Sequence, residues 1–151
     1  MKGEGLKKKV TLLEAEKFHG HLGPYLVLGI LAGEFALKKL GCKKYFGINI
    51  KVYGADKKPK SCLIDGLQLS SGATFGKGNI VKLNGNAIKI EFFDCLKNKQ
   101  ITLKLKENIM HKLKKVETHK DSEILAKELF KEARSNTSGL SPFTFNLSLM
   151  E

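Results

Sequence analysis

The 151-residue chain contains a single arginine, Arg134, although its formal net charge is +12 at pH 7. Almost all of its positive charge therefore comes from lysine. Such a charge favours acidic partners, but proteins that read nucleic-acid sequence usually depend on arginine, whose planar guanidinium forms paired hydrogen bonds. The lysine clusters at 7–9, 57–58 and 112–115 have no aromatic residues between them, which also argues against nucleic acid. Nucleic-acid binding thus rests on charge alone, and a solvated lysine coat explains the charge equally well.

The chain also has few cysteines, and its three are far apart, at positions 42, 62 and 95. Their odd number and the lack of any Cys-x-x-Cys pair exclude a disulfide framework and a four-cysteine zinc ribbon. Free cysteines of this kind are typical of a reducing compartment. No signal peptide is recognisable, and the most apolar stretch, residues 22–36, is too short and too rich in glycine to span a bilayer. We therefore expect a cytoplasmic protein without a membrane-spanning segment.

No internal repeat and no Pro- or Ser-rich linker divides the sequence. We expect residues 1–10 to form a basic N-terminal arm and residues 11–151 to form one α+β domain, with helices packed on an antiparallel sheet. Capping signals and apolar periodicity predict helices at residues 12–19, 24–40, 60–71 and 121–133. Alternating apolar residues predict strands at residues 46–53, 80–83, 87–93, 100–106 and 143–149.

Two further patterns predict how these elements pack. The sequence Asn84-Gly85-Asn86 is a hairpin signal, so strands 80–83 and 87–93 are expected to pair with each other. Gly29 and Gly33 lie four residues apart on one helix face, which would let another helix approach closely. That close approach is either internal packing or a dimer seam.

Two histidines, His19 and His21, flank a single glycine just before the long apolar helix. In an extended segment both imidazoles would point the same way and could reach one metal ion. Farther along, Cys62 and Asp65 lie one helical turn apart; a thiolate can ligate zinc, and a carboxylate can ligate it or orient a histidine. The alternative is structural: one histidine caps the next helix, and Cys62 is a small buried apolar residue.

Cys62 has a second possible role. It lies near the N-terminus of its predicted helix, with Lys58 and Lys60 close in sequence. Both features are expected to lower the pKa of its thiol and to favour a nucleophilic thiolate, with His19 or His21 as its base. Cys62 and His19 are therefore the candidate catalytic residues, although the sequence does not establish that any reaction is catalysed.

The glycine-rich loop at residues 72–79 resembles a phosphate-binding P-loop only in part. Its glycines are one residue too close together, and Gly78 stands where a serine or threonine is needed. Successive glycine amides with Lys77 could still hold an anionic ligand. The alternative is a tight turn into the strand that begins at Ile80.

Taken in order, these motifs resemble the FmdE family, which is named for a component of formylmethanofuran dehydrogenase, over residues 12–106. The resemblance rests on His-Gly-His-x-x-Pro, Cys-x-x-Asp-x-x-Gln and Gly-x-Thr-x-Gly-Lys-Gly-Asn. It implies an α+β homodimer with a motif-lined cleft, often with a bound divalent metal such as zinc, and a link to archaeal methanogenesis or to molybdenum and tungsten enzymes. It also implies metal-site residues His19, His21, Cys62 and Asp65, and cofactor-binding residues Thr74, Lys77 and Asn79.

The chain departs from the family pattern in its thiols. Gly23 and Ala73 stand where the family often has cysteine, and the paired cysteines of the family's C-terminal zinc-binding module are absent from the sequence. Cys62 is then the only thiol left in the motifs. One interpretation is a metal-binding domain with an open site, where a metal could activate water. The other is a non-catalytic accessory subunit that keeps the fold and has lost the metal.

Overall fold

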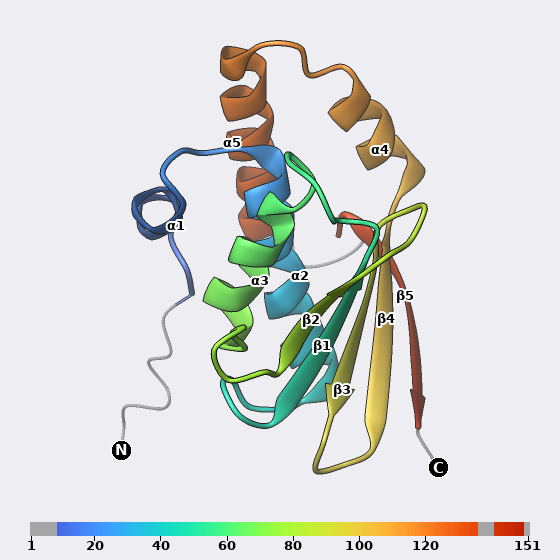
Figure 1. Cartoon of the computed structure of the whole chain (residues 1–151). Coiled ribbons are helices and arrows are strands. Elements are labelled where there is room, and N and C mark those ends of the chain that lie inside the picture. The colour runs from blue at the N-terminus through green and yellow to red at the C-terminus, as the bar shows by residue number, and fades with distance from the viewer. Residues whose placement is uncertain (1–8, 136–140, 150–151) are drawn as a thin grey trace.

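The computed structural model describes residues 9–135 and 141–149 (Figure 1). Most of the expected N-terminal arm lies outside these ranges, but Val10 is buried and its carbonyl oxygen accepts a hydrogen bond from Arg134 at 3.0 Å. The packed structure therefore includes residue 10. The elements in chain order are α1 (Leu12–His19), α2 (Pro24–Leu40), β1 (Ile48–Tyr53), α3 (Cys62–Ser71), β2 (Ile80–Leu83), β3 (Lys89–Asp94), β4 (Lys99–Leu105), α4 (Glu107–Lys114), α5 (His119–Ser135) and β5 (Phe143–Leu149).

The five strands form one sheet in the order β2-β1-β3-β4-β5, which confirms the α+β class. All neighbouring pairs are antiparallel except β1 and β2, which are parallel. The predicted hairpin between β2 and β3 is wrong, because β1 lies between these strands and pairs with both. The turn signal is local, whereas the pairing follows burial: Ile48, Ile50 and Val52 are almost fully buried, so β1 is a central strand with a partner on each side.

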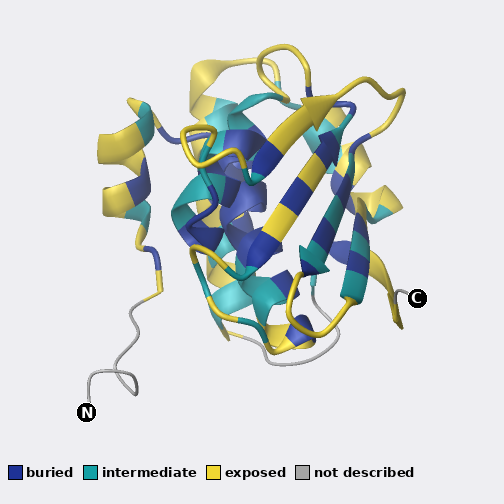
Figure 2. Ribbon diagram, turned by 60° about the horizontal axis from the view of Figure 1, so that its bottom comes forward, coloured by how far each residue is buried: buried dark blue, intermediate teal, exposed yellow. Residues whose placement is uncertain are grey.

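The helices pack on one face of this sheet. Residues of β1 alternate between buried and exposed, and Figure 2 shows this alternation with the helices behind the sheet. The first part of α2 is buried around most of its circumference, as the apolar run from Leu26 to Ile30 predicts. No described element covers the opposite face of the sheet, which we call the open face (Figure 2).

The tightest contact in the core joins α2 to α3. A Cβ added at Gly29 would collide with the backbone of Leu63, and one added at Gly66 would collide with the backbone of Leu26. Gly33 faces the side chain of Ser70 in the same way. The glycine pattern of α2 therefore serves internal helix packing, one of the two alternatives that the sequence leaves open.

Two elements differ from the sequence-based expectation. Helix α4 was not predicted; it is short and buries only Ile109, so its apolar signal is weak. In β5 the predicted shared face exists, since Phe143, Phe145 and Leu147 pair in register with residues of β4. Phe143 is buried, but Phe145 and Leu147 remain 46% and 43% exposed because β5 is an edge strand. Within the described ranges, no helix has both the length and the apolar character needed to cross a bilayer.

Candidate functional site

The histidine motif lies where several helix ends meet. Helix α1 ends at His19, and α2, α3 and α5 begin at Pro24, Cys62 and His119, all toward the same end of the molecule (Figure 1). Gly20 ends α1 with a φ of 107°, a left-handed conformation that suits glycine and turns the chain toward α2. These connections bring three segments that are distant in sequence to one end of the helical layer, which we call the histidine end.

His19 and Asp65 form the closest polar pair at this end. The Nδ1 atom of His19 lies 2.6 Å from Oδ2 of Asp65, with the two side chains 12% and 37% exposed. Since a carboxylate can only accept a hydrogen bond, Nδ1 is the donor, and the neutral imidazole keeps a lone pair on Nε2. Histidines that ligate metals or act as bases are commonly oriented in this way by a carboxylate.

A third histidine, not identified from the sequence, belongs to the same end. The ring centroid of His21 lies 5.0 Å from that of His19 and 5.4 Å from that of His119. His21 therefore stands between an imidazole from α1 and one from the start of α5. No local motif marks His119, because only the packing of α5 against α2 brings it near the other two.

The position where the family often has a cysteine is adjacent to this histidine row. A Cβ added at Gly23 would lie 3.4 Å from Cε1 of His21 and 3.3 Å from the hydroxyl of Ser122. A thiol at this position would therefore lie beside His21, whereas glycine places no donor there. Ala73, the other departure, is fully buried at the far end of α3.

Cys62 does not have the activated thiol that the sequence predicts. Burial raises the pKa of Cys62 above its ordinary value, the negative charge of Asp65 raises it further, and the positive charge of Lys58 lowers it. The predicted lowering was wrong because partial burial and the carboxylate one helical turn away outweigh the lysine. Cys62 stays a neutral thiol over a wider pH range than an exposed cysteine.

The donor chemistry of the histidine end suits zinc and related ions, since imidazole nitrogens and a thiol are among the ligands these ions prefer. The placement of the side chains fits less well. Within residues 9–135 and 141–149, no group of three or more His, Cys, Asp or Glu side chains converges as a metal site. The described side chains thus offer the close pair His19–Asp65 and neighbouring imidazoles rather than a preformed cage.

The glycine-rich loop lies at the other end of α3. Helix α3 has ten residues, so its two ends are about 15 Å apart. The structure therefore does not bring Thr74, Lys77 and Asn79 together with His19.

Each of these three loop residues binds a neighbouring part of the protein. The side chain of Asn79 accepts from the Thr74 amide at 2.9 Å and donates to the Tyr45 carbonyl at 2.8 Å. The Thr74 hydroxyl accepts from the amide of Lys77 at 3.1 Å, and the Lys77 ammonium donates to the Gly72 carbonyl at 2.5 Å. These contacts favour the tight-turn alternative over an anion site.

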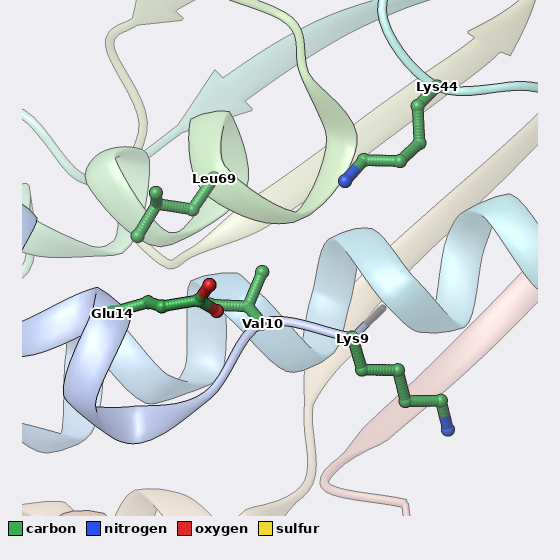
Figure 3. Close-up of a pocket in the computed structure, with 5 residues that line it drawn as sticks. All are labelled: Lys9, Val10, Glu14, Lys44 and Leu69. Carbon is green, nitrogen blue, oxygen red and sulfur yellow. The ribbon is translucent and has the colours of Figure 1, made fainter. Parts of the chain in front are cut away.

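A surface pocket of about 240 Å³ lies beside α1 (Figure 3). The described residues that line it are Lys9, Val10, Glu14, Lys44 and Leu69. The histidines lie elsewhere, so this pocket is not the cleft that the family resemblance implies.

The chain is thus an α+β domain with a carboxylate-oriented histidine at the meeting point of its helix ends. Residues 18–138 match the FmdE family, described as "FmdE, Molybdenum formylmethanofuran dehydrogenase operon". Because this match covers most of the chain, the protein belongs to the FmdE family, which confirms the resemblance read from its motifs.

Two individual proteins are similar to it. A crystal structure of an FmdE-like protein of tungsten formylmethanofuran dehydrogenase from Syntrophus aciditrophicus superposes with a TM-score of 0.57 and 17% identity, covering 96% of this chain and 78% of that one. This likeness shows the shared fold. A "Probable S-adenosyl-L-methionine-binding protein" from Archaeoglobus fulgidus is 32% identical over 77 residues. That match spans 48% of this chain but only 20% of the relative.

Proposed function

We propose that this protein is a metal-binding FmdE-family domain that serves a molybdenum or tungsten formylmethanofuran dehydrogenase or a related enzyme. Its metal would be a divalent ion, with zinc as the first candidate, held by His19 and His21. Asp65 orients His19, and Cys62 is available one turn away. The proposal includes a cytoplasmic location and a homodimeric state.

The contact between His19 and Asp65 supports this proposal most directly. A hydrogen bond of 2.6 Å fixes the ring orientation and leaves the Nε2 lone pair of His19 free for an ion or a proton. A histidine that only capped α2 would not need a carboxylate partner from a helix 46 positions farther along the chain. When bound, a divalent ion would supply Lewis acidity at this end of the molecule.

The association with a larger enzyme rests on the family and on charge. The family description refers to the molybdenum formylmethanofuran dehydrogenase operon. The net charge of +12 favours an acidic partner surface. For the homodimer, the uncharged edge strand β5, with Phe145, Leu147 and Leu149 partly exposed, offers an apolar edge of the kind that usually requires cover.

The competing function is a non-catalytic accessory subunit without metal. Two observations favour it: glycine stands at position 23 beside His21, and no described group of three ligands converges. In that case the pair His19–Asp65 would stabilise the junction between α1 and α3.

Metal analysis of anaerobically purified protein distinguishes the two. We expect close to one divalent ion per chain by inductively coupled plasma mass spectrometry in the wild type and in His111→Ala, an exposed histidine of α4 that serves as the control. The variants His19→Ala and His21→Ala are expected to lose the ion, and Cys62→Ser to retain less of it. Wild-type protein that holds no metal and takes up no added zinc, iron or cobalt would establish the accessory function instead.

A further inference from the structure

The open face of the sheet has an unusual composition for an uncovered surface. Strand register places Lys51, Lys89 and Lys104 on this face, with Glu91 as the one acidic residue among the described residues of these strands. The outward residues of β5 are small and polar. The face is therefore basic and rich in hydrogen-bonding groups, and no described element covers it (Figure 2).

Aromatic rings lie between these lysines, on the two central strands β1 and β3. The Lys51 ammonium lies 5.3 Å from the ring centroid of Phe93, and the Lys89 ammonium lies 4.5 Å from that of Tyr53. Glu91 is already engaged, since it accepts from the Tyr53 hydroxyl at 3.2 Å and lies 3.8 Å from Lys89. Its charge is therefore largely compensated within the face.

A surface hollow lies at one end of the face, beside Phe93. Its volume is about 430 Å³, and its lining includes Asn49, Lys51, Asn79 and Val81. This volume falls within the range of about 300–1,000 Å³ that is usual for small-ligand sites. One wall thus offers an aromatic surface, and the others offer amide groups and an ammonium.

The same pairing continues beyond the hollow, on the turn that Asn79 holds in place. The ring of Phe46 is 80% exposed and lies 5.0 Å from the ammonium of Lys77. The adjacent Tyr45, also exposed, lies 5.2 Å from Lys44. Since the side chain of Asn79 lines the hollow and donates to the Tyr45 carbonyl, the two aromatic–lysine groups are joined.

We propose that the open face binds single-stranded nucleic acid, with bases stacked on Phe93 and Phe46 and phosphates held by Lys51 and Lys77. Alternating aromatic and basic side chains are the means by which proteins hold unpaired bases, because every base has a face that can stack. The net charge of +12 complements a polyanion. The sequence hides this pattern, because strand pairing, not sequence proximity, brings each lysine to its ring. This site is distinct from the histidine end and does not depend on the metal proposal.

Fluorescence anisotropy with a labelled single-stranded RNA and a DNA of the same sequence, about 12 nucleotides long, tests the proposal. The wild type is expected to bind at about 50 mM salt and to bind more weakly at about 200 mM. Phe93→Ala is expected to lower the affinity about tenfold, whereas Phe93→Tyr, which keeps the ring, retains it. Lys51→Ala is expected to weaken binding and to reduce its salt dependence, in contrast to Lys131→Ala on α5, where an exposed lysine lies away from the face.

Four results would overturn the proposal. The first is no binding at about 50 mM salt, and the second is an equal loss in Lys51→Ala and Lys131→Ala, which would indicate general charge attraction. The third is a mononucleotide that competes as well as an unlabelled oligonucleotide, which would assign the hollow to a small ligand. The fourth is a dimer in sedimentation that Phe93→Ala converts to a folded monomer, which would show that a second copy covers the face.

Discussion

Replacement of Gly29 by alanine tests the close approach of α2 and α3 on which the histidine end depends. A Cβ at position 29 would lie 2.0 Å from the carbonyl oxygen of Leu63 and 2.9 Å from the amide nitrogen of Leu67. Ordinary contacts need about 1.2 Å more, so the helices must separate. Because the obstacle is backbone and not a movable side chain, no rotamer change relieves it.

The expected cost follows from two opposing effects. Overpacking of a core typically costs about 1–3 kcal/mol, and a rigid obstacle places Gly29→Ala toward the upper end of that range. Alanine is a better helix former than glycine by about 1 kcal/mol, which offsets part of the cost. We therefore expect a net loss of about 2 kcal/mol in the free energy of unfolding. For a chain of this size that corresponds to a decrease of about 4–8 °C in Tm.

Far-UV circular dichroism during urea unfolding is the appropriate assay, since the chain has no tryptophan. Gly47→Ala is the matched control, because the nearest atom to an added Cβ there is the Lys43 carbonyl oxygen at 3.7 Å, an ordinary contact. We expect this control to be neutral or slightly stabilised. A Gly29→Ala protein as stable as Gly47→Ala would refute the backbone-to-backbone packing of α2 and α3.

Three further predictions concern charged groups and thiols. Arg134→Ala should cost about 2 kcal/mol in unfolding free energy, because Arg134 donates two hydrogen bonds to Glu34, at 2.6 and 3.0 Å, whereas Lys127→Ala, which removes an exposed pair with Glu123, should cost about 0.5 kcal/mol or less; equal effects in urea unfolding would contradict this. Asp65→Asn should accelerate iodoacetamide alkylation of Cys62 at pH 8, measured by mass spectrometry, because the Asp65 charge helps to raise the pKa of that thiol; an unchanged rate would count against it. Burial raises the pKa of Cys42 to about 11 from 9.0, so the folded state holds a proton that the unfolded state releases; the stabilisation is complete below about pH 9 and lost as the pH rises toward 11. The urea midpoint of the wild type should therefore fall more between pH 8 and pH 10.5 than that of Cys42→Ala.

Features set by local chemistry were predictable from the sequence. The Thr11–Glu14 pattern forms a capping box in which both reciprocal hydrogen bonds are present, and α1 begins directly after it. Pro24 begins α2 and Gly41 ends it, the latter with a φ of 69°. Each of these signals acts within one helical turn, so no tertiary contact was needed to interpret it.

Features that depend on distant partners were not predictable in the same way. The turn sequence at residues 84–86 is a sound hairpin signal, but the burial of β1 placed that strand between the two expected partners. The pKa of Cys62 depends on burial that a helix position cannot reveal. His119 joins the histidine row only because α5 packs beside α2, across a separation of nearly one hundred residues.

The motifs that mark the family in sequence do not form a single site in space. The first two, with His19 and Asp65, meet at the N-terminal end of α3, whereas the third follows its C-terminal end, about 15 Å away. There the role of Asn79 is structural: its amide holds the turn in which Tyr45 adopts a φ of 79°, an uncommon conformation for a bulky residue. Recurrence of the third motif with the other two is therefore explained by the fold, since α3 must be fixed at both ends to hold Asp65 against His19. Evidence for a ligand at the histidine end would accordingly imply nothing about the loop, and each end needs its own test.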